Sequence, residues 1–314
     1  MEMSVKSESI VDASTLTREA LTEEYVRRIL NCEQLHVPDH SMKDFYGMGG
    51  FFQWVNFSDI LPSVPDVAPS SARISVCILT HNNAAYIESI IKAIRPLAYE
   101  VIAVDSGSTD GTAQILQGAA DRIVTAENAW GFDRKRNTAI QAAQGDWILM
   151  LDSDEAISDV GFSALRRYIT WADSNNVDVL WLPRYWIQKS CALPLRHYVG
   201  ELCLWPDPQA RLFRAGAQCR YDGVIHEKLH SRQDGKACMI GNPRCALYHF
   251  KYWLYTEETL AQTVNARAAL QSDNLDGVQL LPWHYGKQTK QIPDELPGDN
   301  IRCLLDRLTG TKVF

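Results

Sequence analysis

The stretch GDWILMLDSDEA, residues 145–156, decides the fold class. Its apolar run WILML is typical of a strand that is buried on both faces. Three carboxylates, Asp152, Asp154 and Glu155, follow where this strand ends. Two acidic side chains with D-x-D spacing at a strand's carboxyl end can meet one divalent cation, which can also hold the phosphates of a nucleotide. Because D-x-D pairs are common by chance, the case for a metal site depends on the rest of the chain.

Strand-like and helix-like segments alternate along the chain around this stretch. The predicted strands cover residues 74–80, 100–107, 122–126 and 147–151, and the predicted helices lie near 84–94, 111–119 and 132–143. Such alternation indicates right-handed βαβ units and a mostly parallel sheet flanked by helices. Ligands bind these sheets outside the carboxyl ends of the strands. We therefore expect an α/β fold with its binding site at the edge where Asp152 and Asp154 lie.

Polar residues also collect at the carboxyl ends of the first two predicted strands. They are Thr80, His81, Asn82, Asp105, Ser106 and Ser108. Local roles are an alternative for this region: Asn82 and Asn83 suit turns, Thr109 and Asp110 suit helix caps, and Gly107 and Gly111 suit turn positions. Local roles explain single residues, but they do not explain why three strand ends carry polar groups at one edge.

The second half of the chain loses this regular alternation. A helix is predicted over 158–175, a strand over 177–186, and further strand-like segments over 209–214, 223–229 and 245–253, which together indicate a mixed sheet with long loops. A helix at 256–272 and a proline-bearing tail with a short helix near 301–308 follow. We divide the chain into an N-terminal extension at 1–72, an α/β domain at 73–272 with halves 73–157 and 158–272, and a tail at 273–314.

The N-terminal extension combines a predicted helix with an aromatic patch. Ser14 or Thr15 would cap the helix, whose apolar residues recur at helical spacing up to Leu30. Six aromatic residues then fall between Phe45 and Phe57. We expect them to dock the extension onto the main domain, because aromatic side chains dominate burial in cores and interfaces. Acceptor contact, membrane contact and a homodimer contact are alternative uses of the same surface.

Charge and cysteine usage argue against several classes of protein. The 31 basic and 38 acidic residues give a net charge of −7, which argues against nucleic-acid binding because phosphate affinity comes largely from Lys and Arg. The first strand is not followed by G-x-G-x-x-G, and G-x-x-x-x-G-K-[ST] is absent from the sequence. The eight cysteines form no C-x-x-C pair, and no apolar run approaches the ~20 residues of a membrane helix. We expect a cytoplasmic protein without a transmembrane segment, and peripheral membrane contact stays open.

Three ordered motifs, ISVCILTHN, VIAVDSGSTDGT and GFDRKRNTAIQAAQGDWILMLDSDE, resemble the nucleotide-binding half of family 2 glycosyltransferases with the GT-A fold. This resemblance covers about residues 73–160. The later segments DPQARLFR, VIHEKL and LYHF resemble the branch that contains lipopolysaccharide-core β-glucosyltransferases and the S- and O-glycosyltransferases of bacteriocin peptides. The resemblance implies a Rossmann-like GT-A domain with a mixed acceptor-side subregion.

Several residues for the nucleotide follow from the resemblance. Thr80 and Asn82 would line the uridine pocket, and Asp105 would accept a hydrogen bond from the uracil ring. Arg136 and Asn137, in the segment RKRN, match an Arg-Asn pair that lies near the nucleotide in this family. The resemblance therefore implies a UDP-sugar donor.

The D-x-D residues would hold the rest of that donor. Asp152 would contact the ribose or a metal-bound water, Ser153 belongs to the same donor set, and Asp154 would bind Mn²⁺ or Mg²⁺ across the diphosphate. His249, in YHF, resembles a late histidine that completes the metal or diphosphate shell. The alternative for His249 is a core strand histidine. The resemblance thus implies a metal set of Asp152, Asp154 and His249.

A general base is also needed, because in a single displacement one side chain deprotonates the acceptor as it attacks the anomeric carbon. The leading candidate is Glu227, in V-I-H-E, and the others are His226 and Asp207. The sequence has His-Glu where the family commonly has an E-D pair, so this assignment departs from the family pattern. Gln209 and Arg211 would hold the diphosphate or the acceptor, or they form a surface strand with an ion pair.

The function implied is a metal-dependent inverting transfer of a hexose, of glucose or N-acetylglucosamine type, from a UDP-sugar. The acceptor would be a saccharide-lipid such as lipopolysaccharide core, another cell-surface glycan, or a peptide Cys or Ser. One alternative is a non-catalytic module that binds nucleotide sugars or glycans. A second is a sugar-phosphate nucleotidyltransferase, which expects a glycine-rich basic signature after the first strand, and residues 80–85 have none.

Overall fold

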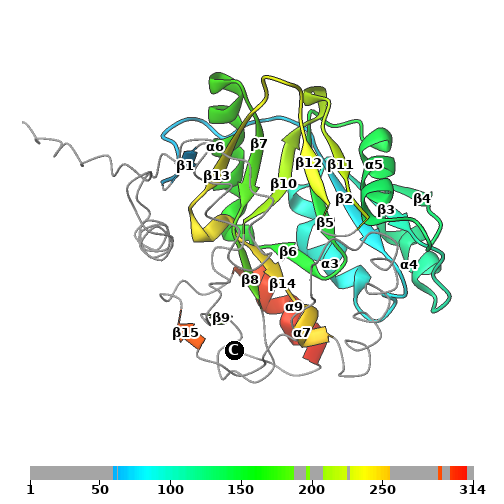
Figure 1. Ribbon diagram of the computed structural model, residues 1–314. Helices are drawn as coiled ribbons and strands as arrows, with labels where there is room; N and C mark the ends of the chain where they lie inside the picture. Colours follow the sequence, from blue (N-terminus) through cyan, green and yellow to red (C-terminus); the bar gives the residue numbers. More distant parts are fainter. Residues whose placement is uncertain are drawn as a thin grey trace, which may run out of the picture.

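Figure 1 shows a computed structural model of the protein, with a central sheet surrounded by helices. The structure describes residues 59–61, 63–186, 196–198, 208–224, 227–254, 289–291 and 298–309. The predicted N-terminal helix, the aromatic patch at 45–57 and the predicted helix at 256–272 lie outside the described residues.

The central sheet has eight strands in the order β1-β13-β7-β10-β5-β2-β3-β4. They are β1 (Asp59–Leu61), β2 (Ile74–Thr80), β3 (Glu100–Asp105), β4 (Arg122–Thr125), β5 (Trp147–Asp152), β7 (Val177–Leu182), β10 (Gln209–Arg214) and β13 (Lys236–Ile240). Strand β10 runs antiparallel to both of its neighbours, β5 and β7, and the other paired strands are parallel. The predicted mostly parallel α/β sheet of the GT-A class is confirmed.

Helices cover this sheet, whose central strands are mostly apolar and buried. Every residue of β2, β3 and β7 is buried, and β5 is buried up to Asp152, which is partly exposed. The helices are α3 (Ile87–Ile94), α4 (Thr112–Ala119), α5 (Phe132–Ala142), α6 (Phe162–Asn175), α7 (Lys251–Leu254) and α9 (Asp299–Thr309). Helix α5 packs on β2 and β3, and α6 packs on β7. No described helix is both long enough and apolar enough to span a membrane.

Smaller sheets lie beside the central one, as the mixed pattern of the second half predicts. Strands β6 (Glu155–Ile157), β14 (Leu247–His249) and β8 (Arg184–Trp186) form one of them, with β14 in the middle. Strand β14 is antiparallel to β6 and parallel to β8. The described residues also form two antiparallel pairs, β11 (Arg220–Asp222) with β12 (Lys228–His230) and β9 (Arg196–Tyr198) with β15 (Thr289–Gln291).

Three predicted strands in the second half have the wrong extent. The predicted strand at 177–186 is divided at Pro183 into β7 and β8, which belong to different sheets, because proline has no N–H to donate to a ladder. The segment at 245–253 contributes only β14, between a 3₁₀ turn (Pro243–Cys245) and α7. The segment at 223–229 overlaps only the start of β12. Short apolar runs suit helix and strand alike, so periodicity could not separate these cases.

The C-terminal helix α9 confirms the short helix predicted near 301–308. The amide Nδ2 of Asn300 donates to the backbone carbonyls of Ala93 at 2.8 Å and Ile157 at 2.9 Å. Its Oδ1 accepts from the backbone N–H of Asp159 at 2.9 Å. Asn300 therefore joins α9 to the ends of α3 and β6. Figure 1 shows α9 in red beside the small sheet of β6, β14 and β8.

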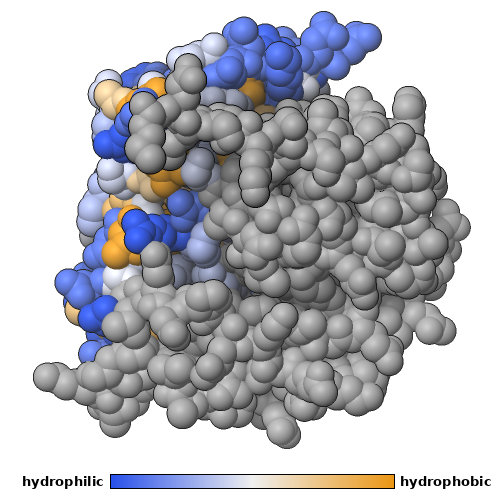
Figure 2. All heavy atoms as spheres, turned by 90° about the vertical axis from the view of Figure 1, so that its left-hand side faces the viewer, coloured by the Kyte–Doolittle hydropathy of each residue, from blue (hydrophilic) through white to orange (hydrophobic). Residues whose placement is uncertain are grey.

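The described surface does not gather its hydrophobic residues in one place. In the face that Figure 2 shows, hydrophobic side chains of the described residues form small groups between hydrophilic ones. Large hydrophobic residues that are exposed within the described ranges, Tyr99, Ile123 and Val160, belong to different segments.

Candidate active site

The loops that follow β2 and β3 are tied together by side chains that the sequence assigned to the uridine pocket. Asn82 Oδ1 accepts from the backbone N–H of Thr109 at 2.8 Å, and the Asn82 N–H donates to Ser108 Oγ at 2.9 Å. The Oγ1 of Thr80 donates to Asp105 Oδ1 at 3.2 Å, and the Ser108 N–H donates to Asp105 Oδ2 at 3.2 Å. The structure thus brings Thr80, Asn82 and Asp105 together at one end of two neighbouring strands.

Asp110 stabilises the same pair of loops. Its Oδ2 accepts from the Ala84 N–H at 2.9 Å, and its Oδ1 accepts from the N–H of Thr112 at 3.0 Å and from Thr112 Oγ1 at 2.6 Å. Partial burial raises the pKa of Asp110, but the hydrogen bonds from Thr112 and Ala84 lower it more, so the pKa lies below its ordinary value. The cap residue of α4 is Gly111, so the predicted role of Asp110 as the helix cap is wrong. Asp110 precedes the cap, and its carboxylate accepts from the N–H of Thr112, the first residue of the helix.

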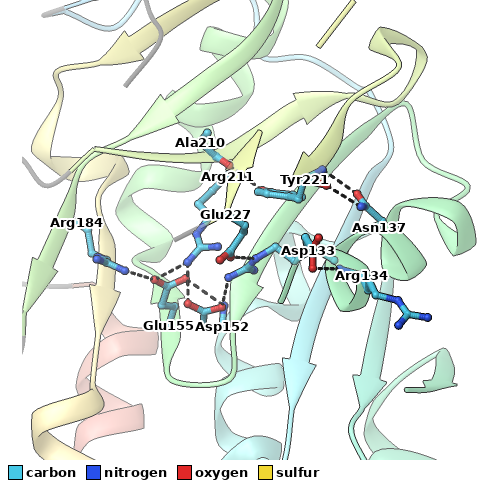
Figure 3. Close-up of polar contacts among 11 residues, drawn as sticks. Asp133, Arg134, Asn137, Asp152, Glu155, Arg184, Ala210, Arg211, Tyr221 and Glu227 are labelled. Atoms are coloured by element: carbon cyan, nitrogen blue, oxygen red, sulfur yellow. Dashed lines mark hydrogen bonds and ion pairs between the residues drawn. The ribbon is translucent and has the colours of Figure 1, made fainter. Parts of the chain in front are cut away.

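Two arginines from different elements hold Asp152 at the end of β5 (Figure 3). Arg136 of α5 donates from Nη2 to Asp152 Oδ1 at 2.6 Å, and Arg211 of β10 donates from Nη2 to Oδ2 at 2.7 Å. Burial raises the pKa of Asp152, but the two guanidinium groups outweigh it and hold the pKa well below the ordinary value of 3.8. Asp152 is therefore a carboxylate fixed between two cations.

The ion pairs continue on both sides of Asp152. Arg136 Nε donates to Glu227 Oε1 at 2.5 Å, and Arg211 Nη2 donates to Glu155 Oε1 at 3.3 Å. Arg184 Nη1 donates to the same Oε1 of Glu155 at 3.0 Å. We call this set the acid–arginine chain, and its members in order are Glu227, Arg136, Asp152, Arg211, Glu155 and Arg184.

Asn137, the second residue of the predicted Arg-Asn pair, holds a strand. Its Nδ2 donates to the Tyr221 carbonyl and its Oδ1 accepts from the Tyr221 N–H, both at 2.8 Å. This fixes β11 against α5. The Tyr221 ring lies 5.4 Å from the Arg136 guanidinium carbon, and its hydroxyl donates to the Ala210 carbonyl at 2.8 Å. Asn137 therefore supports Arg136 through Tyr221. The contact with Tyr221 could not be predicted from the RKRN segment alone.

Asp154 and His249 form a second polar pair beside the chain. His249 Nε2 lies 3.3 Å from Asp154 Oδ1, and both residues are buried. The antiparallel register of β6 with β14 sets His249 opposite Glu155, and the Phe250 N–H donates to the Asp154 carbonyl at 2.8 Å. Burial raises the pKa of Asp154, but His249 lowers it more, so the pKa lies below its ordinary value.

This pair fits a divalent ion that also takes ligands from a substrate. Adjacent ligands of an octahedral ion with bonds of about 2.1 Å stand about 3 Å apart, close to the observed O–N separation. Within the described ranges, no group of three or more His, Cys, Asp or Glu side chains is arranged to hold a metal. Mg²⁺ is commonly bound by one or two carboxylates together with substrate phosphates, so a site with few protein ligands suits it.

The remaining candidates are placed less directly. Ser153 is buried in the turn between β5 and β6, and Gln209 is partly buried at the start of β10. Asp207 and His226 lie outside the described residues. Reasoning from the sequence missed the contribution of Arg184 and left Glu155, the third acid of the opening stretch, without a role.

Comparison with known proteins places the chain in a family. The model of the family described as Glycosyl transferase family 2 matches residues 75–253, more than half of the 314 residues. A glycosyltransferase of Rickettsia bellii is 39% identical over 87 residues, which are 27% of this chain and 29% of that protein. The poly(ribitol-phosphate) β-N-acetylglucosaminyltransferase TarS of Staphylococcus aureus is 28% identical over 118 residues, or 34% of this chain and 20% of that protein.

A crystal structure of S. aureus TarS in complex with UDP-GlcNAc aligns with 65% of this chain and 68% of that chain, with a TM-score of 0.40 and 20% identity. The chain spans between a fifth and a third of the length of the two relatives described above. The match of the family model, which extends from β2 to α7, establishes that the chain belongs to glycosyl transferase family 2.

Proposed function

We propose that the protein is a metal-dependent hexosyltransferase that moves a hexose from a UDP-sugar to an acceptor with inversion at the anomeric carbon. One observation carries the proposal: the Asp154–His249 pair lies beside the acid–arginine chain, next to the carboxyl end of β5. That edge is where open α/β sheets bind their ligands. We assign the donor mainly to residues 73–157 and the acceptor mainly to residues 158–272.

The two buried arginines support a site for the diphosphate. Arg136 Nη1 and Arg211 Nε are buried, and neither has a hydrogen-bond partner among the residues that the structure describes. A buried donor without a partner is costly, and a phosphate oxygen would satisfy it. Thr80, Asn82 and Asp105, on the neighbouring strand ends, would then take the uridine.

The charge that develops on the leaving diphosphate has to be neutralised. Asp154 and His249 are the residues that we assign to Mn²⁺ or Mg²⁺, and a bound ion would act there as a Lewis acid. Asp152 contributes through its two arginines, since both of its carboxylate oxygens are hydrogen-bonded to them. On this assignment Asp152 orients the cations, and Asp154 carries the ion.

Glu227 is the proposed general base. Its carboxylate lies next to Arg136 and is mostly buried, with 12% of the side chain exposed. A carboxylate in this place would take the proton from an acceptor hydroxyl or thiol as that group attacks the sugar. Asp207 and His226 stay alternatives for the same role. The acceptor is a saccharide-lipid, a cell-surface glycan or a peptide Cys or Ser.

The sugar is proposed to be of the glucose or N-acetylglucosamine type. In its name TarS is a β-N-acetylglucosaminyltransferase, and its 28% identity over 118 residues of this chain supports the second of these sugars. The proposal is tested by incubating the protein with UDP-glucose or UDP-N-acetylglucosamine, with Mn²⁺, Mg²⁺ or a chelator, and measuring UDP release. We expect release that needs the ion and rises with a suitable acceptor.

One observation favours a second candidate function, a module that binds a nucleotide sugar without turnover. Both oxygens of Asp152 and one oxygen of Glu227 are already bonded to arginines, as in a structural ion-pair network. The transferase and the binding module differ in whether UDP is released from a donor. Saturable UDP binding, measured by calorimetry, with no UDP release from any donor would support the binding module and overturn the transferase.

A further inference from the structure

Glu155 is a buried acid that the proposed chemistry does not use. It has no exposed surface, and among the described residues its polar partners are Arg184, Arg211 and the backbone N–H of Asp152. Oε1 accepts from Arg184 and Arg211, and Oε2 accepts from the backbone N–H of Asp152 at 3.1 Å. A carboxylate buried in this way does not touch a ligand. Any role in the reaction must therefore act through the residues that it holds.

On one side Glu155 holds an arginine, Arg211, that we assign to the diphosphate site. Its ion pair with Arg211 fixes the guanidinium that also binds Asp152, and its bond to the Asp152 N–H fixes the end of β5. Figure 3 shows these contacts as one continuous set from Arg184 to Glu227. A shift of Glu155 would therefore move Arg211 and the end of β5 that carries Asp152.

On the other side Glu155 acts on the strand that carries His249. In the small sheet β14 lies between β6 and β8, with Glu155 on β6 and Arg184 on β8. The Glu155–Arg184 ion pair thus connects the two outer strands across the middle one. The register sets His249 directly opposite Glu155. The same ion pair therefore fixes β14, and with it the position of His249 beside Asp154.

We propose that Glu155 is a positioning residue for the transfer, which sets the two parts of the site, the Asp154–His249 pair and the Asp152–Arg211 pair, relative to each other. This inference rests on the proposed function. Residues that orient ligands without touching the ion typically contribute 10–100-fold to metal affinity or activity. We expect the contribution of Glu155 to metal affinity and activity to fall in this range, because Glu155 supports both pairs at once.

The test replaces Glu155 by glutamine, which keeps its size and removes its charge. We expect E155Q to bind Mn²⁺ in the presence of UDP about 10–100-fold more weakly, as measured by electron paramagnetic resonance of the free ion. We also expect kcat for UDP release to fall by a similar factor of about 10–100. Metal binding is read without turnover, so it still reports on Glu155 if the protein proves to be a binding module.

The matched control is Asp178→Asn. Asp178 on β7 is also fully buried and also pairs with arginine, accepting from Arg232 Nε at 2.7 Å and Nη2 at 3.1 Å. It stands at the start of β7, whereas Asp152 stands at the end of the parallel strand β5. D178N therefore loses the ion pair of a buried acid with a half-exposed arginine at the opposite edge of the sheet. We expect it to lose stability and to keep metal binding and kcat per folded molecule.

A second variant separates positioning from folding. E155Q leaves Arg184 without this anion, and the double variant E155Q/R184Q restores the balance of charge. We expect the double variant to recover thermal stability and to keep the weak Mn²⁺ binding. Metal binding and kcat in E155Q that equal those of D178N would overturn the inference, and so would recovery of both together with stability in the double variant. Wild-type protein that binds neither Mn²⁺ nor UDP would overturn the proposed function itself.

Discussion

His249 Nε2 lies 3.3 Å from Oδ1 of Asp154, in a contact between two distant parts of the chain. Asp154 belongs to the turn after β5, and His249 ends β14. Their closeness depends on the pairing of β14 with β6. The segments that we assign to the donor and to the acceptor therefore meet at this contact, and the ion that we propose would be held by one side chain from each.

Asp154→Asn tests the ion site directly. The variant removes the charge that would bind the ion and leaves His249 without its carboxylate partner. We expect Mn²⁺-dependent UDP release to fall by at least about 100-fold, and His249→Gln to lose about 10–100-fold. The control is Asp146→Asn, because Asp146 is a half-exposed acid before the other end of β5. Turnover in D154N equal to that in D146N would contradict the metal assignment.

Arg136→Lys tests whether the acid–arginine chain needs a guanidinium. Arg136 uses Nε for Glu227 and Nη2 for Asp152, and a lysine ammonium is a single point charge that cannot reproduce this fork. We expect kcat/KM for the UDP-sugar to fall about 10-fold or more. The control is Arg134→Lys, since Arg134 is exposed and stacks on Trp130 at 4.4 Å. Steady-state kinetics measure kcat/KM for both variants. Equal kcat/KM values would show that a positive charge at residue 136 is sufficient without the guanidinium group.

Much of the fold of residues 73–157 could be predicted from the sequence. The strand expected at 74–80 is β2 without change, and the segment WILML forms the buried part of β5. Their burial on both faces follows from continuous apolar residues, a local property of the chain. The convergence of Thr80, Asp105 and Asp152 then follows from the parallel order of their strands.

The rest could not be predicted, because it depends on pairing between distant segments. The partners of Asp152 come from α5 and from β10, an antiparallel strand inserted beside β5. The part played by Glu155 depends on β8 and β14, which lie far along the chain. Nothing in the local pattern around Pro183 reveals that β8 leaves the central sheet. Register and strand order are properties of the whole fold, whereas periodicity describes one segment at a time.

Glu227→Gln tests the general base. Glutamine keeps the shape of the side chain but cannot accept the acceptor proton. We expect kcat to fall by about 10²–10⁴-fold while calorimetry shows UDP binding close to that of wild type. The variants Asp207→Asn and His226→Gln are measured in parallel, since these residues are the alternative candidates. A larger loss in either of them than in E227Q would move the base to that residue.

Asp110→Asn tests the connection between the loops after β2 and β3 through its pH dependence. The pKa of Asp110 in the folded protein is below its ordinary value of 3.8, so the ionised carboxylate stabilises the fold above this pH. That contribution is lost as the pH falls through the lower, folded pKa. We expect the difference in unfolding free energy between wild type and D110N to be constant above about pH 5 and to shrink below the ordinary pKa. Urea unfolding at a series of pH values measures it, and a difference that does not change with pH would contradict the contacts of Asp110.

Asn300→Ala tests whether the C-terminal helix is part of the folded domain. The amide of Asn300 donates to the carbonyls of Ala93 and Ile157 and accepts from the Asp159 N–H, so alanine leaves three backbone groups without this partner. We expect a loss of about 2 kcal/mol in the free energy of unfolding, because partly buried polar groups would lose their hydrogen bonds. The control is Asp299→Asn, whose side chain is 88% exposed and pairs with Arg302 only at 3.7 Å. Because exposed pairs contribute little, D299N should unfold within about 0.5 kcal/mol of wild type. Equal stability of N300A and D299N in urea would mean that α9 adds little to the fold, whereas the expected difference would show that the helix stabilises the strand that carries Glu155.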